Sequence, residues 1–474
     1  MKKIFSLLVL SCMLLVSHAQ DTQGTQDTQD TYVYICKDGD YTKQKVSEGF
    51  DIDLNDAPDS ITFHKPALPI VVEVVYNGTE ASVTIPKCMK DSVTYAKVNN
   101  LDSYVYIEYK GSTDEVIYDV KGSSSNGALI IKSDYKMQVN LNNVSLTSSC
   151  GEAMRFKCGK RIALVMAEGS VNTFVDANDG GVTPDPLDNH KACIYTKGHI
   201  EISGAGTLNV TGNYNHAIDS KEHIKVKQSV RAINILGAVG DGIHAGEFFT
   251  MNGGALTINN TVMKDGVQVE YKTDEKGKKI IDEENTGDIT INGGTIDITL
   301  ASTEDAKCIK TVGNVFINGG TLLLHATANG TRGIQAGGSL TITQAEGVLT
   351  DITIFAEGAK CTVEEDHEDP DKCMGINVDR DVTISGGTIH ITASGQSANG
   401  LKADHNITIE GGDITIEALG DSSNGMKIGN NVTVTGGSTV VRNPTTAKKS
   451  KGIVYSGTKS VTGGEIRASW TYKQ

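Results

Sequence analysis

The chain has 474 residues, enough for two to four ordinary domains or for one long repeat array. Its formal charge is 43 − 58 = −15, and a surface of that sign repels nucleic acid and anionic lipid, so we exclude both as partners. Only 38% of the residues are hydrophobic and 52 are glycine, which favours many short strands separated by turns.

The N-terminus has the features of an export signal. Two lysines precede the apolar run 4–16, and residues 17–19 offer small side chains at the two positions that a signal peptidase reads. This predicts a signal peptide over residues 1–19, cleaved after Ala19. Neither this run nor any later one is long enough for a transmembrane segment. We therefore expect an extracellular, cell-surface or periplasmic protein; a lipoprotein anchored through Cys12 is the weaker alternative, because apolar sequence continues past that cysteine.

Three short regions lead into the body of the chain. Residues 20–31, QDTQGTQDTQDT, contain no apolar residue and predict a disordered linker. Residues 32–67 alternate in short β-rich runs around Asp38-Gly39, a hairpin signal, and predict a short N-terminal β-module. Residues 68–136 continue as strands without a fixed period and are expected to form a β-rich cap.

A repeat begins at Met137. The strands that open its copies start at Met137, Ile162, Ile200, Ile224, Phe249, Ile289, Val315, Leu340, Val382, Ile407 and Val432. Seven of the ten intervals are 24 to 26 residues, and the other three, of 38 to 42, fit one unit plus an inserted loop. The units alternate with period two and break at Gly-Gly or Asn-Gly, without a helix signal. We therefore predict an all-β fold in which residues 137–474 form a parallel β-helix of about eleven coils.

Each unit carries a step of a small residue, an apolar residue and a polar residue, as in Gly400-Leu401-Lys402. If the apolar residue points into the core, the next one must point outward, and stacking places the outward residues in one file, about 4.8 Å apart. The predicted file is Asp219, His244, Gln268, Lys310, Gln335, Asn377, Lys402 and Lys427.

A second polar file precedes the small residue and contains Asp241, Asp265, Arg332, Asn399 and Asn424. Two interpretations remain open for both files. Outward positions of any solenoid are polar, and Asn or Asp before Gly serves turns; alternatively, the files bind a ligand.

A straight file of this spacing suits an extended polysaccharide, whose sugar repeat is similar in length. The repeat body contains few aromatic residues, so such a surface would hold sugars by hydrogen bonds and charge. Lys310, Arg332, Lys402 and Lys427 would supply cations to a uronic-acid polymer. Asp219, Asp241 and Asp265 could instead bridge to its carboxylates through Ca²⁺.

The insert CTVEEDHEDPDKC is acidic. Its carboxylates are a second candidate Ca²⁺ site, formed by Glu364, Glu365, Asp366, Asp369 and Asp371; a solvated loop is the alternative. In an exported chain, the pairs Cys150/Cys158 and Cys361/Cys373 are close enough to close local disulfide loops.

Several stretches, among them EVIYDVKGSSSNGALIIKSDYKMQVNLNNVSLTSS, CIYTKGHIEISGAGTLNVTGNYNHAIDSKEHIKV and the G-D-G-I and K-D-G-V steps, resemble the exported carbohydrate-binding β-helix family. The resemblance covers roughly residues 70–474. It implies a right-handed β-helix related in fold to pectate lyases, with Ca²⁺ and pectin-like or cellulose-like ligands. One departure is that the family's D-G-I appears here once as His216-Ala217-Ile218, which removes an acid from that coil.

We therefore expect a monomeric, exported protein that binds an acidic plant polysaccharide with the help of Ca²⁺, and we assign no catalytic residue. A surface adhesin or structural spacer is the first alternative. A polysaccharide lyase is the second, with Asp241, Asp265 and Lys310 as the residues that would serve it. A hydrolase is less favoured, because the outward file contains only one carboxylate.

Overall fold

The computed structural model describes residues 32–37, 40–45, 60–62, 70–98, 101–112, 114–178, 190–274, 276–301, 303–361, 372–444, 446–469 and 471–473. The chain divides into two compact units, Met1–Leu68 and Pro69–Gln474. The predicted signal peptide and linker, residues 1–31, lie outside the described residues. Among the residues described, no helix has the length and apolar character needed to cross a membrane.

The first unit contains a three-stranded antiparallel sheet in the order β2-β1-β3. Its strands are β1 (Tyr32–Lys37), β2 (Asp40–Lys45) and β3 (Ser60–Thr62). β1 and β2 pair from Tyr32↔Lys45 to Lys37↔Asp40, which is the hairpin expected around Asp38-Gly39.

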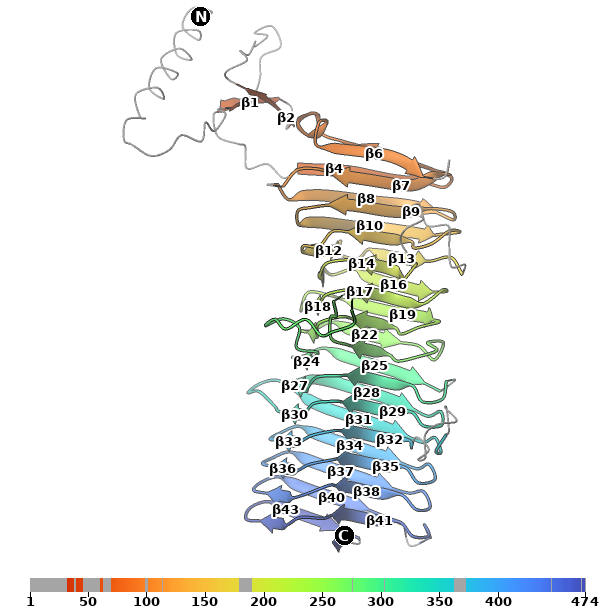
Figure 1. The fold of residues 1–474 in the computed structure, drawn as a ribbon, viewed down its shortest axis with the longest axis vertical. Coiled ribbons are helices and arrows are strands. Elements are labelled where there is room, and N and C mark those ends of the chain that lie inside the picture. The colour runs from red at the N-terminus through yellow and green to blue at the C-terminus, as the bar shows by residue number, and fades with distance from the viewer. Residues whose placement is uncertain are drawn as a thin grey trace, which may run out of the picture. The chain divides into compact units, whose positions relative to one another are not determined.

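The second unit is a column of coils in which the chain passes through three parallel ladders and returns to the first (Figure 1). Sheet 1 contains β12 (Ile162–Met166), β15 (Ile200–Ser203), β18 (Ile224–Val226), β21 (Phe249–Met251), β24 (Ile289–Ile291), β27 (Val315–Ile317), β30 (Leu340–Ile342), β33 (Val382–Ile384), β36 (Ile407–Ile409), β39 (Val432–Val434) and β42 (Lys459–Val461). Sheet 2 contains β13 (Val171–Val175), β16 (Thr207–Gly212), β19 (Ala232–Ala238), β22 (Ala255–Ile258), β25 (Thr295–Leu300), β28 (Gly320–Ala326), β31 (Thr350–Ala356), β34 (Thr388–Ala393), β37 (Asp413–Ala418), β40 (Ser438–Arg442) and β43 (Glu465–Ala468). The long strand β10 (Met137–Thr147) pairs with both β12 and β13 and joins these two ladders.

Sheet 3 runs along the remaining side of the column. Its strands are β6 (Val93–Val98), β7 (Leu101–Tyr109), β9 (Ala128–Ser133), β11 (Met154–Lys157), β14 (Ala192–Thr196), β17 (His216–Ser220), β20 (Ile243–Ala245), β23 (Val267–Val269), β26 (Lys307–Thr311), β29 (Arg332–Ala336), β32 (Met374–Val378), β35 (Asn399–Ala403), β38 (Asn424–Ile428), β41 (Lys451–Tyr455) and β44 (Thr471–Lys473).

The predicted strand positions are confirmed. Every start expected from Met137 to Val432 is the first residue of a strand, and each pairs in register with the start in the next coil. Parallel pairing also begins earlier than the repeat in the sequence, because β4 (Ile70–Asn77) pairs with β8 (Val116–Ser124), and β8 pairs with β10.

Antiparallel strands lie at the N-terminal end of the ladders. β5 (Glu80–Thr84) pairs with β4, β6 pairs with β7, and the 3-10 turn η2 (Lys87–Met89) connects β5 to β6. Because antiparallel partners use the backbone groups that a preceding coil would otherwise satisfy, these hairpins end the parallel stacking.

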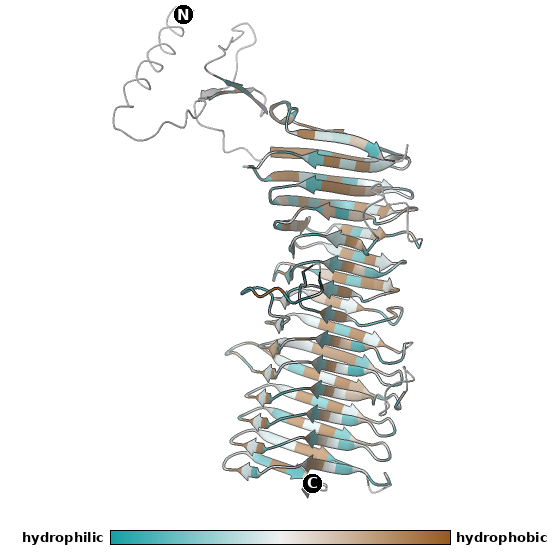
Figure 2. Ribbon diagram, viewed as in Figure 1, coloured by the Kyte–Doolittle hydropathy of each residue, from teal (hydrophilic) through white to brown (hydrophobic). Residues whose placement is uncertain are grey.

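The core is a column of apolar side chains inside the coils. In β18, Ile224 and Val226 are buried while Lys225 between them is partly exposed. The same alternation recurs through the ladders, as the brown and teal bands along the strands show (Figure 2). Inward residues of successive coils stack on one another, so each coil depends on its neighbours for burial.

The repeated glycine of sheet 3 is required by close packing. A Cβ added to Gly400 would lie 2.3 Å from Cγ2 of Ile416 in sheet 2 and 2.6 Å from the carbonyl oxygen of Gly425 in the next coil. Real Cβ atoms do not approach other atoms so closely, so the N-G-[LM]-K phrase uses glycine to let sheet 3 lie close to sheet 2.

We expect Gly400→Ala to destabilise the protein by about 1–3 kcal/mol, the usual cost of overpacking a filled core. Gly159→Ala is the control, because an added Cβ there meets no atom within 4 Å. Urea unfolding followed by circular dichroism should show a lowered midpoint for the first variant only. Equal midpoints would contradict the packing role of Gly400.

Candidate functional site

The outward polar residues of sheet 3 stand in one file. His244 of β20 pairs with Asp219 of β17 and with Gln268 of β23, and the same register continues through the later coils. The file, which we call the outer file, contains Asp219, His244, Gln268, Lys310, Gln335, Asn377, Lys402 and Lys427. The predicted alignment is confirmed, and the role of these residues in binding stays a prediction.

The outer file is less exposed than the sequence suggested. Asp219 and Asn377 are only 6% and 7% exposed, and the other members are half-buried. Neighbours one strand spacing apart, about 4.8 Å, cover one another. Arg332 of the adjacent file is also buried, and its Nη1 donates to Oε1 of Gln335 at 2.5 Å. A ligand would therefore meet the ends of these side chains.

The file before the small residue supports the backbone of the coils. The backbone N–H of Asp265 donates to Oδ1 of Asp241 at 3.0 Å, and the N–H of Lys307 donates to Oδ1 of Asp265 at 2.8 Å. Farther along, Nδ2 of Asn424 donates to Oδ1 of Asn399 at 2.8 Å. These bonds join neighbouring coils rather than close a local turn, and those of Asp241 and Asp265 occupy one oxygen of each carboxylate.

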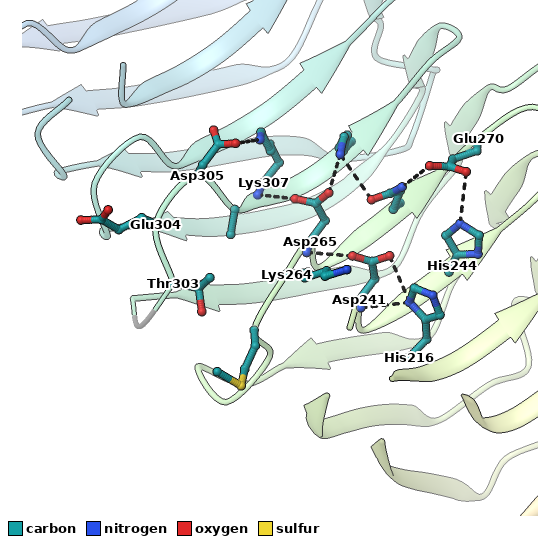
Figure 3. Close-up of a pocket in the computed structure, with 14 residues that line it drawn as sticks. His216, Asp241, His244, Lys264, Asp265, Glu270, Thr303, Glu304, Asp305 and Lys307 are labelled. Carbon is teal, nitrogen blue, oxygen red and sulfur yellow. Dashed lines mark hydrogen bonds and ion pairs between the residues drawn. The ribbon is translucent and has the colours of Figure 1, made fainter. Parts of the chain in front are cut away.

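A cleft of about 650 Å³ lies across the strands β20, β23 and β26, between the loops 259–265 and 301–306 (Figure 3). It brings together five of the predicted residues, namely Asp241, His244, Asp265, Gln268 and Lys310. The other predicted residues of the two files lie in neighbouring or later coils and are not part of the cleft lining, namely Asp219, Arg332, Gln335, Asn377, Asn399, Lys402, Asn424 and Lys427.

His216, noted in the sequence only as a departure from the D-G-I step, also lines the cleft. The remaining residues of the lining were not singled out from the sequence, and they include Met263, Lys264, Glu270, Thr303, Glu304, Asp305 and Lys307. Two of them had a usable signal. Lys307 opens the same four-residue step that ends at Lys310, and Glu270 lies two residues after Gln268, on the same face of the strand. The 301–306 loop carries no repeat signal.

A hydrogen-bonded network crosses the floor of the cleft. Nζ of Lys310 donates to Oδ2 of Asp265 at 2.9 Å and to Oε1 of Gln268 at 3.4 Å. Nε2 of Gln268 in turn donates to Oε1 of Glu270 at 2.6 Å. Two successive coils are thus connected through their outward side chains.

The imidazole of His244 lies between two carboxylates. Its Nδ1 is 2.8 Å from Oδ1 of Asp219, and its Nε2 is 3.8 Å from Oε2 of Glu270. Burial alone would lower the pKa of His244, but the hydrogen bonds and charges of these acids outweigh it and raise that pKa to about 10. The hydrogen bond from His244 also lowers the pKa of Glu270.

The ion pair of Lys310 and Asp265 is itself partly desolvated. Burial raises the pKa of Asp265, an effect that the charge of Lys310 opposes and that of Asp241 reinforces. Burial lowers the pKa of Lys310, but the charge and hydrogen bond of Asp265 outweigh it, so that the pKa of Lys310 is raised. Lys310 is therefore an ammonium ion at neutral pH and does not serve as a proton acceptor.

His216 occupies the position in its coil that Asp241 occupies in the next coil. Its Nδ1 lies 3.1 Å from Oδ2 of Asp241 in the next coil and 3.0 Å from the backbone N of Asp241. Burial tends to raise the pKa of Asp241, but the hydrogen bond and charge of His216 more than offset this and lower it. The departure from the family phrase thus creates a new pairing between coils.

These contacts limit how Asp241 and Asp265 could hold Ca²⁺. Ca²⁺ takes six to eight oxygen ligands. One oxygen of each carboxylate accepts a backbone N–H, and the second faces His216 or Lys310. A Ca²⁺ ion at this place would have to displace His216 and the Lys310 ammonium, so these residues alone do not fit it. The second predicted Ca²⁺ site, Glu364 to Asp371, lies outside the described residues.

The two predicted disulfides are not formed. The Cys158 thiol is buried and donates to the carbonyl oxygen of Tyr135 at 3.3 Å, and the Cys373 thiol is buried and donates to that of Ala326 at 3.5 Å. Burial raises the pKa of both thiols. Because the Cys158 and Cys373 side chains point into the core, they are not placed for the predicted pairings with Cys150 and Cys361.

The position of His244 predicts a pH dependence of stability. A pKa raised from 6.5 to about 10 on folding stabilises the protein fully below about pH 6.5, and this contribution is lost as the pH rises toward 10. We expect the unfolding free energy of His244→Gln to fall less steeply than that of the wild type over this pH range. Each unit by which folding raises the pKa of His244 corresponds to about 1.4 kcal/mol. The measurement is the unfolding free energy of both proteins from pH 6 to pH 10.

The control for this series is His325→Gln, because His325 lies on β28, where its ring stacks on Phe355 at 4.8 Å. The unfolding free energy of this variant should change with pH as steeply as that of the wild type. A parallel pH profile for His244→Gln and the wild type would show that His244 does not carry its charge between Asp219 and Glu270.

Comparison with known proteins completes the picture of this site. A protein from Acetivibrio thermocellus described as a carbohydrate-binding domain-containing protein is 28% identical over 113 residues, which are 23% of this chain and 39% of that protein. The chain thus spans about two fifths of the length of this curated relative. A solved polysaccharide lyase-like protein from C. thermocellum, a gadolinium derivative, aligns with 59% of this chain and 99% of its own at 22% identity and a TM-score of 0.45. The model of one family matches residues 102–421, more than half of the chain, and the chain therefore belongs to the family of carbohydrate-binding domain-containing proteins.

Proposed function

We propose that this protein is an exported carbohydrate-binding protein that holds an extended, acidic polysaccharide along the outer file of sheet 3. The observation that carries the proposal is the unbroken register from Asp219 to Lys427, which presents one polar side chain per coil. A polymer with a sugar repeat near the strand spacing of about 4.8 Å can contact successive coils with successive sugars.

The charges of the later coils favour an acidic polymer. Lys402 and Lys427 are adjacent members of the outer file. Nζ of Lys402 lies 2.6 Å from Oδ1 of Asp404, and this partner is itself half exposed, so the ammonium remains within reach of a ligand. Ion pairs at such exposure contribute little to stability, so replacing Asp404 by a ligand carboxylate would cost little free energy.

Under this proposal, Ca²⁺ binds only together with the polysaccharide. The carboxylates of a uronic-acid polymer would add oxygens to those of Asp241 and Asp265, which do not complete a Ca²⁺ site themselves. Binding in the cleft would then depend on Ca²⁺, whereas binding at Lys402 and Lys427 would depend on ionic strength. EDTA and salt separate these two contributions.

We expect the double variant Lys402→Ala, Lys427→Ala to bind polygalacturonate at least tenfold more weakly, because tenfold corresponds to about 1.4 kcal/mol and two charge-assisted contacts are lost. The melting transition should be retained, because surface changes usually cost less than about 0.5 kcal/mol. Isothermal titration measures the affinity.

The matched control is Lys121→Ala, Lys227→Ala, which removes the same charge from β8 and the end of β18. These lysines pair with Glu73 and Glu201, away from sheet 3. Unchanged affinity in the sheet 3 variant, with an intact fold, would place the ligand elsewhere and favour the surface adhesin.

A lyase is the second candidate, because Lys310 lies beside the adjacent carboxylates Asp241 and Asp265. β-Elimination requires a base that removes a proton next to the sugar carboxylate, and the charged Lys310 cannot accept one. We expect no unsaturated product from polygalacturonate at alkaline pH, with or without Ca²⁺. Growth of product absorbance that Lys310→Ala abolishes would establish the lyase instead.

A further inference from the structure

The cleft has a polar floor, and one large exposed apolar side chain, Met263, is part of its lining. Met263 and Val239 are 54% and 45% exposed, and Tyr214 in the preceding coil is 37% exposed. A parallel bridge between Ala238 and Val262 sets Val239 beside Met263, and the N–H of Met263 donates to the carbonyl oxygen of Ala238 at 2.8 Å. Single exposed apolar residues are common, but here Val239 lies beside Met263, and Tyr214 belongs to the coil before Val239. We call them the apolar rail.

Tyr214 is held rigidly at the end of this rail. Its ring stacks on that of His190 with centroids 4.6 Å apart and planes 11° apart. Nε2 of His190 lies 2.8 Å from Oδ2 of Asp176, and both of these side chains are buried. A fixed ring contributes apolar contact without losing conformational freedom when a ligand binds.

Lys264 follows Met263 and lines the cleft (Figure 3). The other two lysines of the cleft are engaged, since Lys307 lies 2.8 Å from Asp305 and Lys310 lies 2.9 Å from Asp265. For the exposed Lys264 ammonium, no hydrogen bond or ion pair is recorded with any part of the chain that the structure describes. An ammonium in a concave site attracts a carboxylate, and here it need not break an existing pair to do so.

We propose that the cleft is a subsite for one uronic-acid residue, and that Lys264 binds the carboxylate of that sugar. The sugar carboxylate pairs with Nζ of Lys264, its C–H face packs on Met263 and Val239, and its hydroxyls reach Gln268. A pyranose ring has one apolar and one polar aspect, which matches an apolar rail beside a polar floor. This inference rests on the proposed function and adds the residue that distinguishes an acidic sugar from a neutral one.

The test compares polygalacturonate with its fully methyl-esterified form, which has the same backbone and no charge. Lys264→Met keeps the length of the side chain and removes the ammonium. It should weaken binding of polygalacturonate about tenfold, equivalent to about 1.4 kcal/mol, and leave binding of the ester within twofold of the wild type. Met263→Gln should weaken binding of both polymers, because the C–H face loses its apolar contact.

The control is Lys276→Met, which makes the same charge change on the exposed loop between β23 and β24. It should leave both affinities unchanged. If Lys264→Met lowers the affinity for the ester as much as that for the acid, or changes neither, the subsite is wrong. The variant Lys402→Ala, Lys427→Ala tests the proposed function separately. The proposed function stands if this variant still weakens binding of polygalacturonate. The subsite and the proposed function both fail if the wild type binds neither polymer.

Discussion

Parallel hydrogen bonding between successive coils is the constraint on which this molecule depends. A single coil has no sheet partner of its own, so the backbone groups of each strand are satisfied only by the coils before and after it. The pairing sets the axial spacing at about 4.8 Å and prevents a slip by one residue, since a slip would exchange inward residues such as Ile243 for outward ones such as His244. The straight outer file is therefore a consequence of keeping a straight apolar core.

The cleft forms where the repeat is interrupted. The regular coils that begin at Val382, Ile407 and Val432 present a file of side chains, whereas the coils around β23 carry the long connection 270–288 and the 301–306 loop. The connection is tied to the column by Lys272, whose Nζ lies 2.8 Å from Glu222 and 3.0 Å from Glu247. Regular coils thus form a straight file of side chains, and the loops of the irregular coils form the sides of the cleft.

Much of this arrangement follows from the sequence, because periodicity reports which side of a strand a residue faces. Alternation and the 25-residue interval were sufficient to align Lys402 with Lys427 and to place Leu401 in the core. Contacts between side chains of different coils were not predictable. The approach of His216 to Asp241 depends on a residue that breaks the family phrase, and the burial of Cys158 depends on side-chain direction rather than on its distance from Cys150 along the chain. Loops such as 301–306 have no period from which a position can be read.

Charge pairing inside the cleft determines what kind of recognition it supports. Lys310 with Asp265 and His244 with Asp219 already satisfy one another, and removing one member of a partly buried pair leaves the other charge uncompensated. A ligand that replaced one of these partners would gain little binding free energy. The pairs would therefore hold the side chains of the cleft floor in place and exclude ligands of the wrong charge, more than they would add affinity. Under the proposed function, affinity for a polymer would therefore come from many modest contacts along the outer file, added over the coils that one polymer can span. In the binding that we propose, the cleft would select the sugar and the length of the solenoid would hold the polymer.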